Sequence, residues 1–272
     1  MGELVFDIGL HNGDDTAYYL AHGYDVVAVE ANPDFCAAAK KRFTAEVADG
    51  RLTIRNVGIA NRSAELTFWV SERSEWSSFD KENATRTGVS AAPIVVPTVR
   101  FADLLNEYGQ TLYVKIDIEG NDSGCIRDLE RCQSLPPYIS FEGHVKIADD
   151  IRSLAKMGYV EFKFIRQNDW HEITPENMRW QSMVRKTLSS VQRYRLIEGC
   201  LKTIHYRRGR INGWKCASGS SGPLARELPG RWMDYAEVLA VVEDHIAVSN
   251  KLQTGPIGEW FDIHASQRAP RS

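Results

Sequence analysis

The chain has 272 residues, of which 43% are hydrophobic and 25% are charged, and its formal net charge is −3. This composition is typical of a soluble globular protein and excludes a general attraction to nucleic acid or to a membrane surface. No segment is long and apolar enough to span a bilayer, and the N-terminus does not resemble a signal peptide. The five cysteines form no CxxC pair, so we expect reduced thiols and a cytoplasmic protein.

In chain order, the first part of the sequence alternates short β-rich runs with helical patterns, which indicates an α/β fold with a mostly parallel sheet. The predicted strands are Glu3–Ile8, Asp25–Glu30, Leu52–Ala60, Leu112–Ile118, Tyr138–Glu142 and Tyr159–Ile165. The predicted helices are Asp14–Ala21, Pro33–Thr44, Phe101–Tyr108, Ser123–Arg131 and Lys146–Met157. Two further strands, Ala64–Ser71 and Ile94–Val99, are expected on either side of a polar loop.

The alternation ends near Gln167. A long amphipathic helix is predicted from Thr174 to Tyr206, because apolar residues recur there at helical spacing. A Gly/Ser loop, a second helix near Tyr235–Val248 and a last strand, Trp260–Ala265, complete the predicted order.

A D-x-G-x-x-x-G motif follows the first predicted strand and consists of Asp7, Gly9 and Gly13. Glycines there let the backbone approach a ligand, and open α/β sheets bind ligands beyond the carboxyl ends of their strands. Glu30 ends the second strand, where a carboxylate can accept hydrogen bonds from both ribose hydroxyls of an adenosyl group. A tight turn with a solvated Asp7 and Glu30 is the structural alternative, but the two features together favour a ligand site.

The chemistry of the loop distinguishes between two adenosyl ligands. A dinucleotide requires G-x-G-x-x-G, because its pyrophosphate lies at a helix N-terminus. This sequence lacks the middle glycine and has Asp14 and Asp15 at the helix start, where they would repel a pyrophosphate. S-adenosylmethionine has no phosphate and carries a sulfonium and an ammonium group, so the acidic loop favours this cofactor over NAD.

Five segments, in this order, resemble the FkbM-type methyltransferases: VFDIGLHNGDDT, VVAVEANP, RNVGIANRSAELTFWV, LYVKIDIEGND and YISFEGH. The resemblance implies a class I methyltransferase fold, a Rossmann-like seven-stranded sheet with the last strand antiparallel. It also implies O-methylation of a hydroxyl on a sugar or another natural product. We expect S-adenosylmethionine to contact residues at the strand ends and in the loops after them: Asp7, Gly9, His11, Gly13, Thr16, Glu30, Ala31, Asn56, Val57, Gly58 and Asp117.

Methyl transfer to a hydroxyl requires orientation, and a base or a metal that acts on the alcohol. The catalytic candidates lie at the ends of strands four and five and in the first loop: Asp117, Glu119, Glu142, His144 and His11. Asp117 and Glu142 together could hold Mg²⁺; without a metal, His144 or Asp117 would take the proton. Strand-end capping is the structural alternative for Asp117 and Glu142.

Several polar residues have two interpretations. His11 contacts the cofactor or the acceptor, or is equally well a surface histidine. Trp76, Ser77 and Ser78 lie in a loop that reaches the cofactor or is simply polar. His264 is interpreted as structural, because the start of an antiparallel last strand faces the active rim and His264 lies toward the other end.

We predict a single domain, residues 1–272, with a helical insertion at residues 167–258 that covers the site as a lid. The stretch from Arg179 to Lys215 contains ten basic residues and one acidic residue, which gives it a charge of +9. An anionic, hydroxylated small molecule such as a glycan or a nucleotide-linked sugar is therefore the expected acceptor, and a solvated helix face is the alternative. The apolar stripe of the long helix packs on the core or on a twin subunit, which would give a homodimer.

Two other functions stay open. An RNA 2′-O-methyltransferase would use the basic helix, but the sequence has no separate RNA-binding module and no clear aromatic stacking platform. A non-catalytic subunit would bind the adenosyl ligand and use the basic helix for docking.

Overall fold

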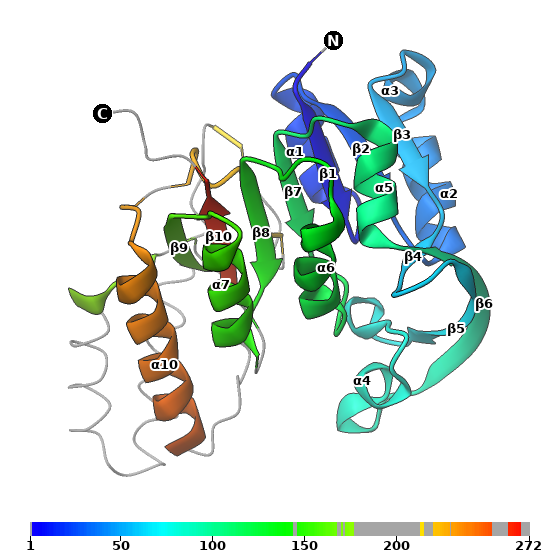
Figure 1. The fold of residues 1–272 in the computed structure, drawn as a ribbon. Helices are drawn as coiled ribbons and strands as arrows, with labels where there is room; N and C mark the ends of the chain where they lie inside the picture. Colours follow the sequence, from blue (N-terminus) through cyan, green and yellow to red (C-terminus); the bar gives the residue numbers. More distant parts are fainter. Residues whose placement is uncertain are drawn as a thin grey trace. The chain divides into compact units, whose positions relative to one another are not determined.

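The computed structural model describes residues 2–143, 146–167, 170, 172–176, 213–214, 220–228, 230–251 and 261–267. The chain forms two compact units, Met1–Phe141 and Glu142–Ser272. Two sheets occur in these residues, one of seven strands and one of three (Figure 1). The predicted α/β fold with a seven-stranded, mostly parallel sheet is therefore confirmed.

Five strands of the larger sheet run parallel in the first unit. Their order is β3 (Leu52–Arg55), β2 (Asp25–Val29), β1 (Leu4–Ile8), β7 (Tyr113–Ile116) and β8 (Tyr138–Glu142). The central strand β1 pairs with β2 on one side and with β7 on the other, so that Asp7 lies opposite both Ala28 and Lys115. Parallel sheets are usually covered on both faces, and the sequences of these strands are accordingly mostly apolar. Asp7 and Lys115 are charged exceptions within them.

Helices connect these strands, and a side-chain cap marks the start of the second one. The helices are α1 (Asp14–Ala21), α2 (Pro33–Arg42), α3 (Thr44–Ala48), α5 (Phe101–Tyr108) and α6 (Asp122–Asp128), the last followed by the short 3₁₀ turn η3 (Leu129–Arg131). Helix α2 begins at the predicted residue, Pro33, which occupies the first helical position, and the Asn32 side chain accepts a hydrogen bond from the Asp34 backbone N–H. This cap fixes the chain direction directly after Glu30.

The predicted strand Leu52–Ala60 is wrong as a single element, because it divides between the two sheets. Its first part is β3 and its last part is β4 (Gly58–Ile59), which joins β6 (Ala91–Val99) and β5 (Ala64–Ser71) in the three-stranded sheet. The break occurs at Asn56, whose side-chain amide donates hydrogen bonds to the backbone oxygens of Glu30 and Ala31.

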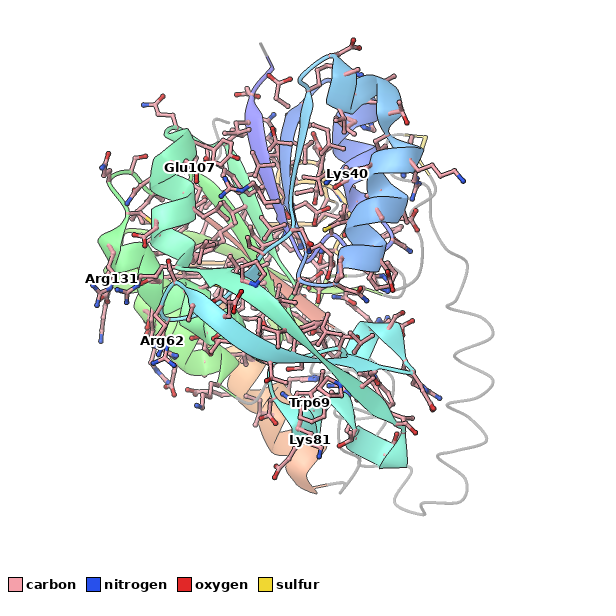
Figure 2. All side chains as sticks on the ribbon, turned by 90° about the vertical axis from the view of Figure 1, so that its right-hand side faces the viewer. Lys40, Arg62, Trp69, Lys81, Glu107 and Arg131 are labelled. Atoms are coloured by element: carbon pink, nitrogen blue, oxygen red, sulfur yellow. The ribbon has the colours of Figure 1, made fainter. Side chains whose placement is uncertain are left out.

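Between β5 and β6 the chain forms two 3₁₀ turns and one short helix instead of a plain loop. They are η1 (Ser74–Trp76), α4 (Lys81–Ala84) and η2 (Arg86–Gly88). The Lys81 ammonium lies 4.6 Å from the centre of the Trp69 ring, which ties α4 to β5 (Figure 2).

The second unit contains α7 (Ile147–Lys156), β9 (Glu161–Arg166), α10 (Tyr235–Lys251) and β10 (Phe261–Ser266). Strand β10 is antiparallel to β9, as expected for the last strand, and His264 pairs with Lys163. His264 is fully buried. Helix α10 packs against α7, and Arg152 of α7 forms an ion pair with Glu243 of α10.

The predicted bounds hold for α1, α5, β5 and β8 and shift by a few residues elsewhere. The predicted long helix from Thr174 and its basic residues fall outside the described residues, apart from its first few positions. The single domain and the lid stay predictions. In the described part of the chain, no helix is long and apolar enough to cross a membrane.

Candidate active site

The loop after β1 lies very close to the end of β7. Gly9 and Gly13 both have positive φ angles, 92° and 79°. A Cβ atom on Gly9 would lie 1.9 Å from the backbone oxygen of Asp117, and one on Gly13 would lie 2.8 Å from the Phe43 ring. The close backbone approach that the sequence predicts is therefore made to the protein itself, and it fixes this loop against the strand end that carries Asp117.

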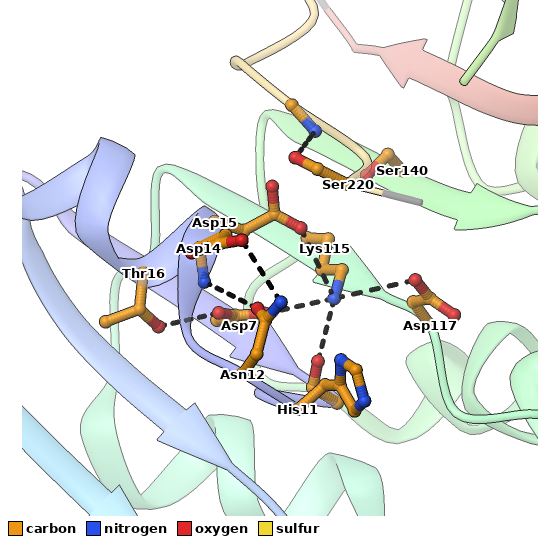
Figure 3. A network of polar contacts seen from close by, with 12 residues as sticks. Asp7, His11, Asn12, Asp14, Asp15, Thr16, Lys115, Asp117, Ser140 and Ser220 are labelled. Atoms are coloured by element: carbon orange, nitrogen blue, oxygen red, sulfur yellow. Dashed lines mark hydrogen bonds and ion pairs between the residues drawn. The ribbon is translucent and has the colours of Figure 1, made fainter. Parts of the chain in front are cut away.

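Lys115 is the centre of a buried charge cluster, which we call the Lys115 cluster: Lys115, Asp7, Asp15 and Asp117 (Figure 3). The ammonium nitrogen of Lys115 lies 3.2 Å from Asp7 Oδ1 and 3.7 Å from both Asp15 Oδ2 and Asp117 Oδ2. It also donates a hydrogen bond of 2.8 Å to the backbone oxygen of Gly9. The cluster thus joins the ends of β1 and β7 to the first turn of α1.

The Lys115 cluster carries more negative than positive charge. Burial alone lowers the pKa of Lys115, but the carboxylates of Asp7, Asp117 and Asp15 outweigh it and hold that pKa well above its usual value. With three carboxylates around one ammonium group, the ionised cluster has a net charge of −2. The side chain of Asp117 is 22% exposed, whereas that of Asp7 is fully buried, so Asp117 is the carboxylate that a ligand can reach.

Two of the predicted cofactor residues have structural roles within this arrangement. Thr16 donates a hydrogen bond of 2.6 Å from Oγ1 to Asp7 Oδ2 and holds that carboxylate in place. Gly58 lies in β4 with the ring of Phe79 against it, since a Cβ atom there would be 2.2 Å from the ring. The predicted contact of Asn56, Val57 and Gly58 with S-adenosylmethionine stays a prediction.

Glu30 follows β2 and is held by two backbone groups. Its carboxylate oxygens accept hydrogen bonds of 2.8 Å, one from the N–H of His11 and one from the N–H of Asn32. Burial raises the pKa of Glu30, and the two backbone hydrogen bonds act in the opposite direction. Because a carboxylate has about four acceptor positions, each oxygen can accept one more hydrogen bond from a ligand.

His11 lies at the same edge, with φ in the left-handed region at 47°. Its Nε2 atom is 2.9 Å from Ser74 Oγ, and its ring packs 4.6 Å from the Phe35 ring centre. Burial lowers the pKa of His11, although the nearby Glu75 carboxylate partly raises it. The imidazole is therefore neutral near pH 7, and it is bound into the site rather than being a free surface histidine.

Glu119, a predicted catalytic residue, is already paired. Arg86 donates two hydrogen bonds of 2.8 Å to its two carboxylate oxygens. Ser78 Oγ donates a further hydrogen bond of 2.7 Å to the backbone oxygen of Glu119. The structure thus gives Glu119 an anchoring contact, and Ser78 brings its loop to this strand end. The contact of this loop with the cofactor stays a prediction.

Among the described residues, no group of three or more His, Cys, Asp or Glu side chains could hold a metal ion. The Lys115 ammonium nitrogen lies 3.7 Å from Asp117 Oδ2, and the magnesium site of Asp117 and Glu142 stays a prediction. Glu142 begins the second unit and His144 lies outside the described residues, so their catalytic roles stay predictions.

The sequence interpretation missed three residues of the site: Lys115, Ser74 and Arg86. For Lys115 a signal exists, because a lysine inside the apolar run Leu112–Ile116 must be paired when the strand is buried. For Ser74 and Arg86 no local pattern indicates a contact with residues far away in the chain.

Comparison with known proteins gives a family. Residues 7–167, more than half of the chain, match the family model of the methyltransferase FkbM domain. None of the curated proteins matches significantly.

Among solved structures, the methyltransferase FkbM from Methylobacillus flagellatus KT is similar over 57% of this chain, with 13% identity and a TM-score of 0.40. The StiE O-MT, residues 942–1257, aligns with 99% of this chain and 69% of its own at 8% identity and a TM-score of 0.39. A phosphoethanolamine N-methyltransferase 2 from Haemonchus contortus aligns with 99% of this chain and 50% of its own at 12% identity and a TM-score of 0.36. The alignment covers only 36% of the length of the Methylobacillus protein. On the match to the family model, the chain belongs to the FkbM methyltransferase family.

Proposed function

We propose that this methyltransferase uses S-adenosylmethionine to methylate a hydroxyl group of a sugar-like or other natural-product acceptor that carries negative charge. The observation that carries the proposal is the Lys115 cluster, whose net negative charge lies at the carboxyl ends of β1 and β7, near Glu30. Ligands of open α/β sheets bind at this edge.

The described residues fit the cofactor in two respects. Asp117 is a partly exposed carboxylate in a negatively charged cluster, which suits the cationic groups of S-adenosylmethionine. Glu30 keeps free acceptor positions for two ribose hydroxyls while the N–H groups of His11 and Asn32 hold it in place. When bound, the cofactor supplies a methyl group on a positively charged sulfur.

His11 is the residue that we assign to the acceptor's proton. A neutral imidazole has one donor and one acceptor nitrogen. If Nε2–H donates to Ser74 Oγ, Nδ1 keeps its lone pair and can accept the proton of the acceptor hydroxyl. Asp117, 3.7 Å from the Lys115 ammonium, then orients the reacting groups. Lys115 holds Asp117 and the Gly9 carbonyl in fixed positions.

The acceptor's negative charge is proposed from the basic stretch Arg179–Lys215, whose charge of +9 contrasts with −3 for the whole chain. Reaction in the cytoplasm is proposed from the cysteines. The three described ones, Cys36, Cys125 and Cys132, form no disulfide. Burial raises the pKa of Cys36 and of Cys132 to about 12, so neither is an activated nucleophile.

Calorimetric titration with S-adenosylhomocysteine, S-adenosylmethionine and NAD tests the cofactor assignment. We expect micromolar binding of both adenosyl ligands, no binding of NAD, and a loss of at least about tenfold in Glu30→Gln, because hydrogen bonds to a charged group are weakened. Glu130→Gln, at an exposed position, is the matched control and should bind like the wild type. A folded wild type that binds neither adenosyl ligand would overturn the proposal.

Transfer of a labelled methyl group tests the acceptor. Anionic sugars and nucleotide-linked sugars should be labelled, whereas matched acceptors with an amine in place of the hydroxyl should not. Labelling of the amines alone would contradict O-methylation while leaving the cofactor assignment intact.

A further inference from the structure

The segment Glu72–Ser90, which joins β5 to β6, is tied to both loops that carry the candidate active site. One tie reaches Glu119 and Gly120 after β7, and the other reaches His11 after β1. Both ties lie within the first unit. The segment is therefore more than the connection of a hairpin.

The tie to β7 is built from several contacts on one short stretch. Arg86 binds both carboxylate oxygens of Glu119, whose side chain is only 16% exposed. Asn83 packs so closely on Gly120 that a Cβ atom there would lie 2.6 Å from its Nδ2. Glu119 has a φ of 40°, a conformation that residues other than glycine adopt only where surrounding contacts fix it.

The tie to the first loop is the contact of 2.9 Å between Ser74 Oγ and His11 Nε2. Ser74 begins the 3₁₀ turn η1, which ends at Trp76. The guanidinium carbon of Arg86 lies 4.6 Å from the centre of the Trp76 ring, and so does that of Arg73. Arg86 therefore touches both the turn that carries Ser74 and the carboxylate that follows β7.

We propose that Arg86 is a positioning residue for the methyl transfer. It holds η1 through Trp76 and anchors this turn to the end of β7 through Glu119, so that Ser74 fixes the ring of His11 and the nitrogen that carries its proton. The importance of this link for catalysis rests on the proposed function, but the link between Arg86 and His11 is a property of the free protein.

The chemistry requires such a link, because His11 can accept a proton at Nδ1 only while Nε2 carries the hydrogen. The Ser74 hydroxyl can accept a hydrogen bond from Nε2–H or donate one to a bare Nε2. The proposed role of His11 requires the first arrangement, in which Nδ1 keeps its lone pair. A planar guanidinium group suits the anchoring position, since it stacks on an aromatic ring and binds a carboxylate with two parallel hydrogen bonds. Lysine can do neither in the same way, so Arg86→Lys should not restore the link.

Nitrogen-15 NMR of the histidine rings tests the proposal on the full chain, with the His11 signals identified by their loss in His11→Gln. In the wild type, we expect His11 to be the Nε2–H tautomer and to titrate below pH 6.5. Ser74→Ala and Arg86→Met should each give a mixture of tautomers. Arg86→Met should also move the midpoint upward toward 6.5, because loss of the anchor exposes the ring and weakens the burial that lowers its pKa. Ser63→Ala, an exposed serine before β5, should change neither property.

A folded Arg86→Met protein with the wild-type tautomer and midpoint would overturn the proposal. If Arg86→Met does not fold, Glu119→Gln weakens the same anchor with a neutral side chain of equal shape. A wild-type tautomer and midpoint of His11 in Glu119→Gln would also overturn the proposal. Calorimetry with S-adenosylhomocysteine separates the two proposals. A response of His11 to Arg86 without ligand binding would refute the proposed function alone, and binding without that response would refute the role of Arg86 alone.

Discussion

At the scale of single residues, the Lys115 ammonium is the group whose removal should disturb the candidate active site most. It is fully enclosed, and its neighbours Asp7 and Asp15 are also buried. Removing one partner of a buried ion pair leaves the other charge without water and without a partner, which is strongly destabilising. Replacing the whole pair by apolar residues is much less destabilising.

Lys115→Met should therefore lower the free energy of unfolding by about 3–5 kcal/mol. Urea denaturation followed by tryptophan fluorescence measures the change. The control is Lys40→Met, on the exposed side of α2 (Figure 2), which should stay within about 0.5 kcal/mol of the wild type. Equal, small effects of both substitutions would show that the cluster does not depend on its lysine.

His264 gives a pH dependence in the second unit. It is fully buried, neither ring nitrogen has a hydrogen-bond partner in the described structure, and burial with the nearby Lys163 lowers its pKa to about 3. The unfolded chain, with a pKa near 6.5, binds a proton that the folded chain refuses, so stability falls as the pH drops below 6.5.

Between pH 7 and pH 5, His264 should cost the wild type about 2 kcal/mol of stability, at about 1.4 kcal/mol per pKa unit. His264→Leu lacks the titrating group, so its loss of stability between pH 7 and pH 5 should be smaller than that of the wild type by about 2 kcal/mol. At pH 7 its stability should be close to that of the wild type. Urea midpoints of both proteins at the two pH values measure the difference. Parallel pH profiles would show that His264 takes up its proton in the folded state.

The residue scale also shows the limit of sequence reasoning. Asp7 and Glu30 were predicted from motif spacing and His11 from its place in the loop after β1, and the structure brings the three to one edge of the sheet. The pairing of Glu119 with Arg86 was not predicted, because a carboxylate in a site motif looks free until its partner from another segment is known. Strand periodicity places side chains on faces, but it carries no information about contacts across 33 residues of chain.

At the scale of elements, the approach of the β1 loop to the end of β7 depends on Gly9. The chain offers a matched comparison, because Gly9 and Gly23 have nearly the same φ, 92° and 85°, but differ in the space around them. A Cβ atom on Gly9 would collide with the Asp117 backbone, whereas one on Gly23 would meet nothing within 4 Å.

Gly23→Ala should therefore lower the free energy of unfolding by about 1–2 kcal/mol, because a residue with a side chain is strained in the left-handed conformation. Gly9→Ala should lower the free energy of unfolding by about 1–3 kcal/mol more than Gly23→Ala does, because the backbone of β7 must also move. It should in addition weaken binding of S-adenosylhomocysteine, which Gly23→Ala should leave unchanged. Urea denaturation and calorimetry of both variants measure these effects, and equal behaviour of the two would mean that the loop does not need its contact with β7.

Element prediction succeeded where the signal is local. The Asn32–Pro33 cap fixes the start of α2, and alternation between polar and apolar residues fixes β5. It failed at Leu52–Ala60, because apolar residues resume at Val57 and Ile59, beyond the end of β3, where the chain leaves one sheet for the other. What divides the strand is the hydrogen bonding of Asn56 to the segment after β2, which is a tertiary contact.

At the scale of the whole molecule, charge is distributed unevenly along the chain. The total is −3, the Lys115 cluster is negative, and the stretch Arg179–Lys215 has a charge of +9. A cationic cofactor and an anionic acceptor would thus be attracted by different parts of the sequence. A protein with a net charge of −3 is not expected to attract polyanions as a whole. If the protein binds a polyanion, the attraction must therefore come from the basic stretch.

We therefore predict that the full-length protein binds a fluorescent heparin oligosaccharide, with an affinity that falls steeply between about 50 and 200 mM salt. Changing Arg193, Arg195, Arg207 and Arg208 to Gln should weaken this binding at least about tenfold, because it lowers the charge of this stretch from +9 to +5. The matched control changes four exposed basic residues elsewhere to Gln, namely Lys40, Lys41, Arg62 and Arg127, and should bind heparin almost as the wild type does. Fluorescence anisotropy measures both proteins, and calorimetry should show the same affinity for S-adenosylhomocysteine in each. If the two fourfold variants lose heparin binding equally, the attraction is spread over the surface, and the case for an anionic acceptor loses its main support.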